Sequence, residues 1–279
     1  MSADRPRAPA APEHGAGQAL AAWFCTPPGR YLLAWEARHF ADAVADAFGY
    51  HALQLGMPQL DALAANRMPH RWLAAPEEVQ PDLVAAQPPQ RPVDLVAHAA
   101  ALPFPADSLD LVVLPHTLEL SADPHAVLRE VERVLVPNGR VVISGLNPLS
   151  LWGLRQARAH LWARAGWASS RWARPYLPEA GAFIGLGRLL DWLRLLSLEA
   201  ERIERGCYRP AVRSERWLRR WAWMDRWGAL VWPPLGAVYF IVAVKRVRGM
   251  RLLGPAWRPT RAAAAPAVVA RRDGQPTPP

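Results

Sequence analysis

Two strongly apolar segments, one on each side of a well-capped helix, limit the folds that this chain can adopt. Leu109–Leu114 (LDLVVL) is too apolar for an exposed strand, so it belongs in the middle of a sheet that is covered on both faces. Asp123 and Pro124 form a preferred helix start, an N-cap acid followed by proline at the first helical position. The helix then carries one apolar face, made by Val127, Leu128, Val131, Val134 and Leu135. Arg140–Ser144 (RVVIS) is the next buried strand, and the three segments together predict a right-handed β-α-β unit with parallel strands.

The rest of the chain repeats this alternation of helical and strand patterns. Helices are predicted over Gly29–Phe48, Gln59–Asn66, Gly187–Leu196 and Ser214–Trp227. Further strands are predicted over His51–Gly56, His70–Ala74, Val93–Ala97, Leu198–Glu204 and Gly236–Val247. The pattern predicts an α/β fold with a doubly wound, mostly parallel, Rossmann-like sheet of seven strands, in which the last strand is antiparallel.

Both ends of the chain differ from this middle part. Residues 1–18 and 251–279 are rich in proline, alanine and arginine with little periodicity, so we predict disordered tails around one domain at 19–250. Hydrophobic residues make up 51% of the chain, which is enough for a sizeable core in such a domain. We expect no secretory signal, because residues 1–17 contain no apolar run.

The net charge of +9 is unevenly distributed along the chain. Residues 1–150 contain 10 arginines and 16 acids, whereas residues 151–279 contain 23 arginines and lysines and 8 acids. A basic second half suits an anionic substrate, a membrane surface or nucleic acid, and it is equally compatible with a solvated arginine-rich face. No nucleic-acid-binding fold is evident, so we do not expect nucleic acid as a partner.

Two further features bear on metal sites and on the membrane. Cys25 and Cys207 are far apart and lack metal-ligand spacing, which argues against a disulfide framework or a zinc site and suits a reducing cytoplasm. Trp227–Val244 is uncharged over 18 residues, which reaches the lower limit for a membrane-spanning helix. Because Pro233-Pro234 would break that helix, and because the following residues are β-branched and aromatic, we predict a turn and a buried strand instead of a transmembrane span.

The stretch Leu102–Pro148 carries a resemblance to a known family. It reads LPFPADSLDLVVLPHTLELSADPHAVLREVERVLVPNGRVVISGLNP, with LPF before a strand SLDLVV, a helix that ends in RVLVPNG, and a strand with its exit loop in ISGLNP. In this order and spacing, the stretch resembles the second half of the cofactor domain in type 11 methyltransferases, a subgroup of the class I S-adenosylmethionine-dependent methyltransferases. The similarity continues more weakly from about Tyr31 to Val247.

The resemblance implies a site at the carboxyl ends of the strands, where open α/β sheets leave a crevice for nucleotide-like ligands. Cofactor contacts are implied after the first, third and fourth strands, by Gln54, Leu55, Gly56 and Met57, by His98 and Ala99, and by Leu114 and Pro115. His116 is a candidate general base, because it follows the fourth strand and a histidine titrates near neutral pH. Asn147 and Trp152 are candidate substrate contacts, and residues 148–182 occupy the place of an inserted substrate cap.

The chain also departs from the family pattern. The first strand of the family ends in roughly D-x-G-x-G-x-G, of which only Gly56 is present, and Pro58 removes one backbone N–H from the turn. Ala74-Ala75 stand where an acid for the ribose is usual, with Glu77 and Glu78 two or three residues later. Two hypotheses follow: a methyltransferase for a small or lipid-like acceptor, and a non-catalytic binding or regulatory protein on the same fold.

Tryptophan and arginine are concentrated in the second half of the chain. Ten of the 14 tryptophans lie between Trp152 and Trp232. In residues 213–227, one helix face carries Trp217, Leu218, Trp221 and Met224 and is predicted to be core. Trp223 and Trp227 share another face with arginines, which favours either Arg–Trp stacking or peripheral contact with a membrane on the cytoplasmic side.

Overall fold

The computed structural model describes residues 13–76, 91–166, 175–178 and 182–246 of the chain. The strands are β1 (His51–Leu55), β2 (His70–Ala75), β3 (Leu95–Val96), β4 (Leu109–Pro115), β5 (Leu135–Leu146), β6 (Leu198–Gly206) and β7 (Val238–Lys245). The helices are α1 (Glu13–Phe24), α2 (Pro27–Ala45), α3 (Thr117–Leu120), α4 (Pro124–Val134), α5 (Leu151–Arg164), α6 (Leu186–Leu195), α7 (Glu215–Arg220) and α8 (Trp223–Val231), with a 3₁₀ turn η3 at Pro233–Leu235.

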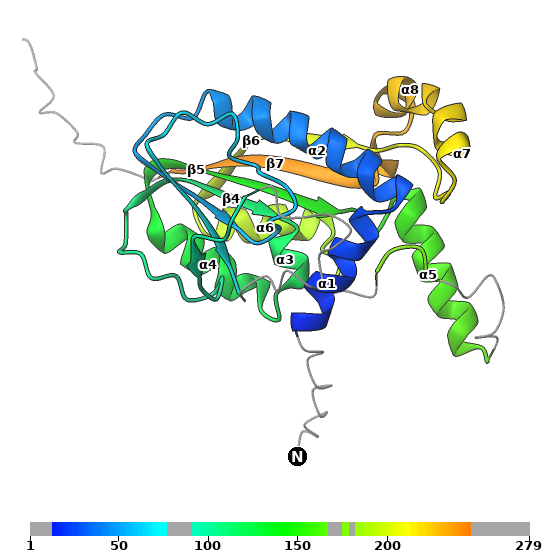
Figure 1. The fold of residues 1–279 in the computed structure, drawn as a ribbon, viewed down its shortest axis with the longest axis horizontal. Helices are drawn as coiled ribbons and strands as arrows, with labels where there is room; N and C mark the ends of the chain where they lie inside the picture. The colour runs from blue at the N-terminus through cyan, green and yellow to red at the C-terminus, as the bar shows by residue number, and fades with distance from the viewer. Residues whose placement is uncertain (1–12, 77–90, 167–174, 179–181, 247–279) are drawn as a thin grey trace, which may run out of the picture. The chain divides into compact units, whose positions relative to one another are not determined.

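The described strands form one seven-stranded sheet in the order β3-β2-β1-β4-β5-β7-β6. The strands β1 to β5 pair in parallel, and β7 runs antiparallel to both β5 and β6. The predicted doubly wound sheet with an antiparallel last strand is therefore confirmed. In Figure 1 the sheet is seen with α2 above it and α4 below it.

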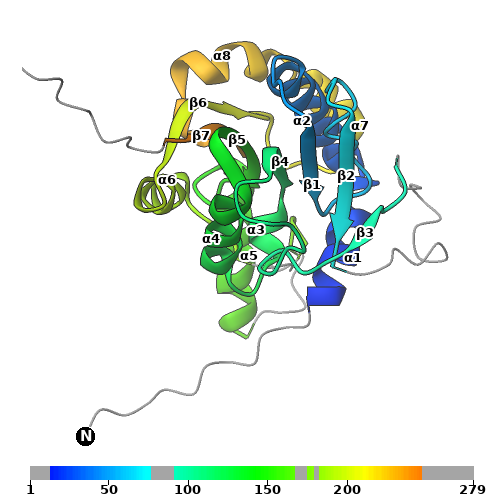
Figure 2. The ribbon, with the colours of Figure 1, turned by 90° about the vertical axis from the view of Figure 1, so that its left-hand side faces the viewer.

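Two apolar cores lie on the two faces of the sheet. Alternate residues of β4 point to opposite faces: Leu111 and Val113 belong to the core beneath α1 and α2, whereas Val112 and Leu114 belong to the core beneath α4 and α6. This two-sided burial explains the unbroken apolar run of the strand. Figure 2, turned by 90°, shows α2 on one side of the sheet and α4 and α6 on the other.

Three local predictions were wrong. Residues 59–66 form turns instead of a helix, and residues 13–18 of the predicted tail belong to α1. The helix expected at Ser214–Trp227 is broken into α7 and α8 at Trp221 and Ala222. The tail at 251–279 and the acids Glu77 and Glu78 lie outside the described residues.

Buried side-chain amides account for the missing helix at 59–66. The Gln54 side chain donates to the Leu60 carbonyl (2.7 Å) and accepts from the Ala62 N–H (2.9 Å). The Asn66 side chain donates to the Val44 carbonyl (2.8 Å) and accepts from the Met68 N–H (3.0 Å). The Leu60 carbonyl, which a helix would have paired with the N–H of residue 64, is thus satisfied by a side chain, and Asn66 ties the end of the segment to α2.

The uncharged segment Trp227–Val244 begins in α8 and continues into the predicted turn and buried strand. Helix α8 ends at Val231, η3 contains Pro233 and Pro234, and all eight residues of β7 are buried. No helix within the described parts of the chain is long and apolar enough to cross a membrane.

Lys245, the single lysine of the chain, ties the end of β7 to the end of α4. Its ammonium donates to the carbonyls of Glu132 (2.7 Å) and Leu135 (2.9 Å) and to Asp107 Oδ1 (2.9 Å), and its side chain is only 9% exposed. The lysine thus satisfies carbonyls at the C-terminus of α4, where a positive charge is also favoured.

Lys245→Met is therefore expected to lower the free energy of unfolding by about 2–4 kcal/mol, because it leaves partly buried carbonyls unsatisfied. Arg246→Met is the matched control, since Arg246 makes exposed ion pairs with Glu199 and Glu201 and should cost less than about 1 kcal/mol. Urea denaturation followed by tryptophan fluorescence measures both values. Equal losses in the two variants would contradict the role given to Lys245.

Candidate functional site

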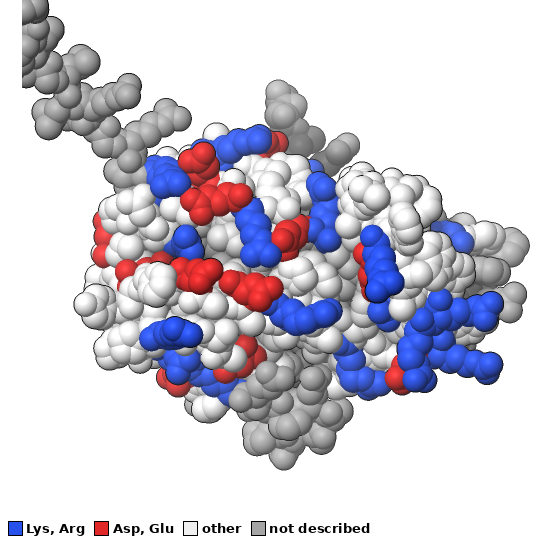
Figure 3. All heavy atoms as spheres, turned by 90° about the horizontal axis from the view of Figure 1, so that it is seen from above, with Lys and Arg blue, Asp and Glu red and all other residues white. Residues whose placement is uncertain are grey.

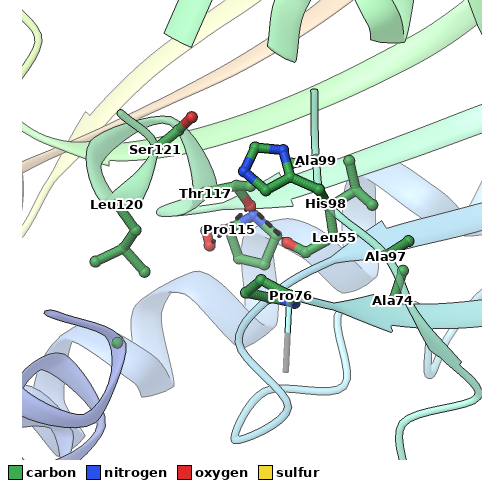
Figure 4. Close-up of a pocket in the computed structure, with 12 residues that line it drawn as sticks. Leu55, Ala74, Pro76, Ala97, His98, Ala99, Pro115, Thr117, Leu120 and Ser121 are labelled. Atoms are coloured by element: carbon green, nitrogen blue, oxygen red, sulfur yellow. Dashed lines mark hydrogen bonds between the residues drawn. The ribbon is translucent and has the colours of Figure 1, made fainter. Parts of the chain in front are cut away.

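A pocket lies at the carboxyl ends of β1, β2, β3 and β4. It is lined by Leu55 and Gly56 after β1, by Ala74 and Pro76 at β2, by Ala97, His98 and Ala99 after β3, by Pro115, Thr117, Leu120 and Ser121 around α3, and by Gly17 of α1. Figure 4 shows these side chains around the opening, with His98 and Thr117 on neighbouring sides. The lining is mostly apolar, and its polar side chains are His98, Thr117 and Ser121.

The turn after β1 has an unusual backbone. Gly56 (φ 74°) and Met57 (φ 53°) are both left-handed, a conformation that glycine adopts freely and methionine does not. A Cβ at Gly56 would contact only Thr117 Oγ1, at 3.6 Å. The glycine therefore serves the turn geometry and leaves open space on the pocket side.

Gln54 holds this turn from within the protein. Its buried side-chain nitrogen lies near the carbonyl oxygens of Gly56 (3.2 Å), Met57 (3.2 Å) and Leu60 (2.7 Å). The two amide protons are shared among these acceptors, so Gln54 shapes the turn and does not line the pocket.

The eight predicted cofactor contacts divide into two groups. Leu55, Gly56, His98, Ala99 and Pro115 line the pocket. Gln54, Met57 and Leu114 are buried behind it, and the Leu114 side chain packs in the core on the α4 side. The sequence thus located the strand ends correctly, although the strand periodicity turns some side chains away from the opening.

His116 lies in a fully buried charge cluster. Its Nδ1 is 2.9 Å from Glu119 Oε2 and its Nε2 is 3.0 Å from Glu36 Oε1, and all three side chains are nearly or completely inaccessible to solvent. The other oxygen of Glu119 accepts from the Leu146 N–H. The cluster connects α2, the end of β4, α3 and β5.

The charge state of His116 follows from this geometry. Burial lowers the pKa of the imidazole, but Glu36 and Glu119 outweigh that effect and raise its pKa from 6.5 to about 10. Each ring nitrogen faces a carboxylate oxygen, an arrangement that suits an imidazolium with both nitrogens protonated. His116 is not among the pocket-lining residues, so we propose that it positions the backbone of Pro115 and Thr117 in place of acting as the general base.

The two candidate substrate contacts are also buried. Asn147 donates to the carbonyls of Pro234 (2.7 Å) and Gly236 (2.9 Å), which joins the end of β5 to the turn before β7. Trp152 donates to the Arg209 carbonyl (2.8 Å) and packs edge-on against Trp23 and Tyr176. Neither lines the described pocket, and the cap predicted at 148–182 includes α5, with residues 167–174 and 179–181 outside the described part.

Sequence reasoning missed Glu36, Thr117 and Gly17. Glu36 occupies the apolar stripe Leu32, Phe40 and Val44 of α2 at four-residue steps, so its place among apolar residues signals a buried charge. Thr117 is the second residue after β4 and the first of α3, and its hydroxyl donates to the Leu55 carbonyl (2.5 Å). Gly17 carried no signal, because the segment around it was taken as a tail.

His116→Gln is expected to lower the free energy of unfolding by about 3–5 kcal/mol, because two buried carboxylates lose their cation. His39→Gln is a matched control, since the His39–Glu204 ion pair is partly exposed and should contribute less than about 1 kcal/mol.

The cluster also predicts a pH dependence. Because the folded pKa of His116 is raised from 6.5 to about 10, its stabilisation is complete below about pH 6.5 and is lost as the pH rises towards 10. Urea denaturation between pH 6 and 10 should show a steeper loss for the wild-type chain than for His116→Gln. Parallel curves would contradict a protonated His116 in the folded state.

Comparisons with known proteins agree with this arrangement. Residues 75–143 match the family model of the type 11 methyltransferase domain, a segment that runs from the end of β2 into β5. The protein YafS of Escherichia coli is 36% identical over 158 residues, which are 56% of this chain and 56% of YafS. The malonyl-[acyl-carrier protein] O-methyltransferase of Halorhodospira halophila is 38% identical over 77 residues, 28% of this chain and 25% of that enzyme.

A solved structure extends the likeness of the fold over most of the chain. A chain from the Haloferax volcanii complex between the methyltransferase activator Trm112 and its methyltransferase superposes with a TM-score of 0.55 at 17% identity, covering 84% of this chain and 99% of that one. The chain spans little more than half of YafS and a quarter of the Halorhodospira enzyme. The chain is thus similar to the methyltransferase-domain family over residues 75–143, about a quarter of its length, and its sheet has the methyltransferase-like topology.

Proposed function

We propose that the chain is a methyltransferase that binds S-adenosylmethionine in the pocket at the ends of β1 to β4 and transfers its methyl group to a small or lipid-like acceptor. The pocket is the observation that supports this function best. It opens at the crevice where α/β sheets of this class take nucleotide-like ligands, and four successive strands of the order β3-β2-β1-β4 contribute to it.

The lining suits the base and ribose of such a cofactor in shape and polarity. Small or apolar side chains, Ala74, Ala97, Ala99 and Leu120, offer a surface on which a flat purine ring can pack. His98 and Ser121 supply polar atoms at the same opening. S-adenosylmethionine, when bound, supplies a methyl group on a positively charged sulfur, which an acceptor attacks in line.

The residues of the chain would act by binding, orientation and exclusion of water. The Thr117 hydroxyl bonds the Leu55 carbonyl and so fixes the start of α3 against the end of β1. Glu119 contacts His116 with one carboxylate oxygen and accepts from the Leu146 N–H with the other, which links the end of β4 to the end of β5. A rigid, apolar wall of this kind positions donor and acceptor and keeps water from the reacting centre.

One observation favours a second function, a non-catalytic binding or regulatory protein of the same fold. None of the described residues that line the pocket carries a carboxylate, and the side chain of Gln54 makes its hydrogen bonds to the turn after β1. A charge-assisted bond to the ribose hydroxyls contributes roughly 1.5–3 kcal/mol, so a site without it binds the cofactor more weakly by about tenfold or more.

Calorimetric titration with S-adenosylmethionine and S-adenosylhomocysteine distinguishes the two functions. We expect micromolar binding that Ala99→Trp weakens at least about tenfold, because the indole fills the pocket. Ala101→Trp is the matched control, since Ala101 is exposed two residues away and does not line the pocket. If a folded wild-type chain binds neither compound up to millimolar concentration, the non-catalytic function stands.

We propose a lipid-like acceptor at the inner face of the membrane, because exposed tryptophans and arginines lie in the segment between β6 and β7, which starts and ends beside the carboxyl end of β5. Incubation of the enzyme with methyl-labelled S-adenosylmethionine and a total bacterial extract should place the label mainly in the organic phase after solvent partition. Label that stays in the aqueous phase would contradict a lipid acceptor and favour a small polar one.

A further inference from the structure

Helix α8 exposes the apolar face that a surface helix normally buries. Trp227 is 56% exposed and Leu230 is 75% exposed, and Trp223 lies on the same side of the helix at 48%. The side that packs against the protein instead carries Gly228 and Asp225. The usual amphipathic arrangement is therefore inverted.

The inverted orientation is fixed by specific contacts. Asp225 accepts from the Tyr31 hydroxyl of α2 (2.5 Å), from the Arg209 guanidinium (2.9 Å) and from the Tyr208 N–H (3.3 Å). Gly228 packs so closely on Tyr208 that a Cβ would lie 2.3 Å from the ring. Rotation of α8 to bury its tryptophans would break these contacts, so the outward apolar face is part of the folded state.

The exposed apolar surface extends beyond α8. We define the Trp patch as the exposed apolar residues of α7, α8 and the turn that follows, namely Trp217, Trp223, Trp227, Leu230, Val231 and Trp232. Each of its residues is at least 47% exposed, so the prediction that Trp217 belongs to the core was wrong. Six large apolar side chains exposed within 16 residues are more than isolated surface positions, and such exposed apolar surface is typical of an interaction site.

Arginines border the Trp patch. Residues 213–226 contain five arginines and two acids, and one of these acids, Asp225, is already paired with Arg209. Arg216, Arg219, Arg220 and Arg226 are exposed. Figure 3 shows an uncharged area at the end of the molecule where Figure 1 draws α7 and α8, with a cluster of basic side chains beside it. Such a surface is complementary to a negatively charged partner with an apolar interior.

The topology puts the Trp patch on the same edge of the sheet as the pocket. The segment between β6 and β7 starts and ends opposite Leu146, because Gly206 and Leu146 both pair with Val238. Leu146 is the carboxyl end of β5, and the pocket lies at the carboxyl ends of the neighbouring parallel strands. A flat partner that contacts the Trp patch would therefore lie near the edge where the pocket opens.

We propose that the Trp patch docks the protein on the surface of an anionic phospholipid bilayer. Tryptophan rings favour the boundary between headgroups and acyl chains, and the bordering arginines would contact lipid phosphates. The surface lies outside the pocket, so this inference holds whether or not the pocket binds S-adenosylmethionine.

Vesicle flotation tests the proposal with the full chain. The wild-type protein should float with vesicles of phosphatidylcholine and phosphatidylglycerol, and rising salt should weaken this binding. Trp223→Ala with Trp227→Ala should reduce the bound fraction at least about tenfold, because two interfacial rings are lost. Phe48→Ala with Tyr50→Ala is the matched control, since these aromatic residues lie outside the Trp patch and are even more exposed, at 83% and 70%.

A second pair of variants tests the charge. Arg219→Glu with Arg220→Glu should abolish the preference for anionic over pure phosphatidylcholine vesicles, whereas Arg67→Glu with Arg188→Glu, two exposed arginines elsewhere, should retain it. Sedimentation of the free protein completes the test. Equal flotation of all variants would overturn the proposal, and so would a wild-type dimer that Trp223→Ala with Trp227→Ala dissociates without a loss of vesicle binding.

Discussion

The buried ion cluster of His116, Glu36 and Glu119 is the constraint on which the surroundings of the pocket depend. A lone carboxylate in this interior would be strongly destabilising, and two carboxylates require a cation between them. His116 supplies that cation from a left-handed backbone (φ 53°) at the point where β4 has ended and α3 begins. The pocket residues Pro115 and Thr117 flank His116 in the chain, so the contacts of His116 hold both of them in place. The same carboxylate of Glu119 accepts from the Leu146 N–H at the end of β5. The buried charge cluster therefore links the end of β5 to the residues that flank the pocket.

The sheet was predictable because its signals are local. The apolar run at Leu109–Leu114, the Asp123 cap and the alternation around it depend on neighbours within a few residues, and the structure has strands and a helix in each place. The turns at 59–66 were not predictable, since they depend on the side chain of Gln54 bonding groups six and eight residues away. Tertiary bonds override helix propensity there.

The site was predictable in position and less so in detail. Strand ends give the location of a crevice, and five of the eight expected cofactor contacts line it. The prediction of His116 as a general base did not consider Glu36, which lies 80 residues earlier in the chain and contacts the imidazole in the structure. A carboxylate in the apolar stripe of α2 was visible in the sequence, but its partner could be found only in three dimensions. A charged residue at an apolar position of a helix therefore needs a partner of opposite charge. That partner has to be identified before a catalytic role is inferred for a nearby titratable residue.

Gln54 shows how a departure from the family pattern can be structural in origin. An aspartate at this position could not donate to the carbonyls of Gly56, Met57 and Leu60, whereas an amide donates to them and still accepts from the Ala62 N–H. The amide therefore compensates for the missing helix after β1 by pinning the turn directly. Because this turn is complete without a ligand, binding energy in the pocket must come from contacts that it leaves open, namely the apolar walls and the polar atoms of His98 and Ser121.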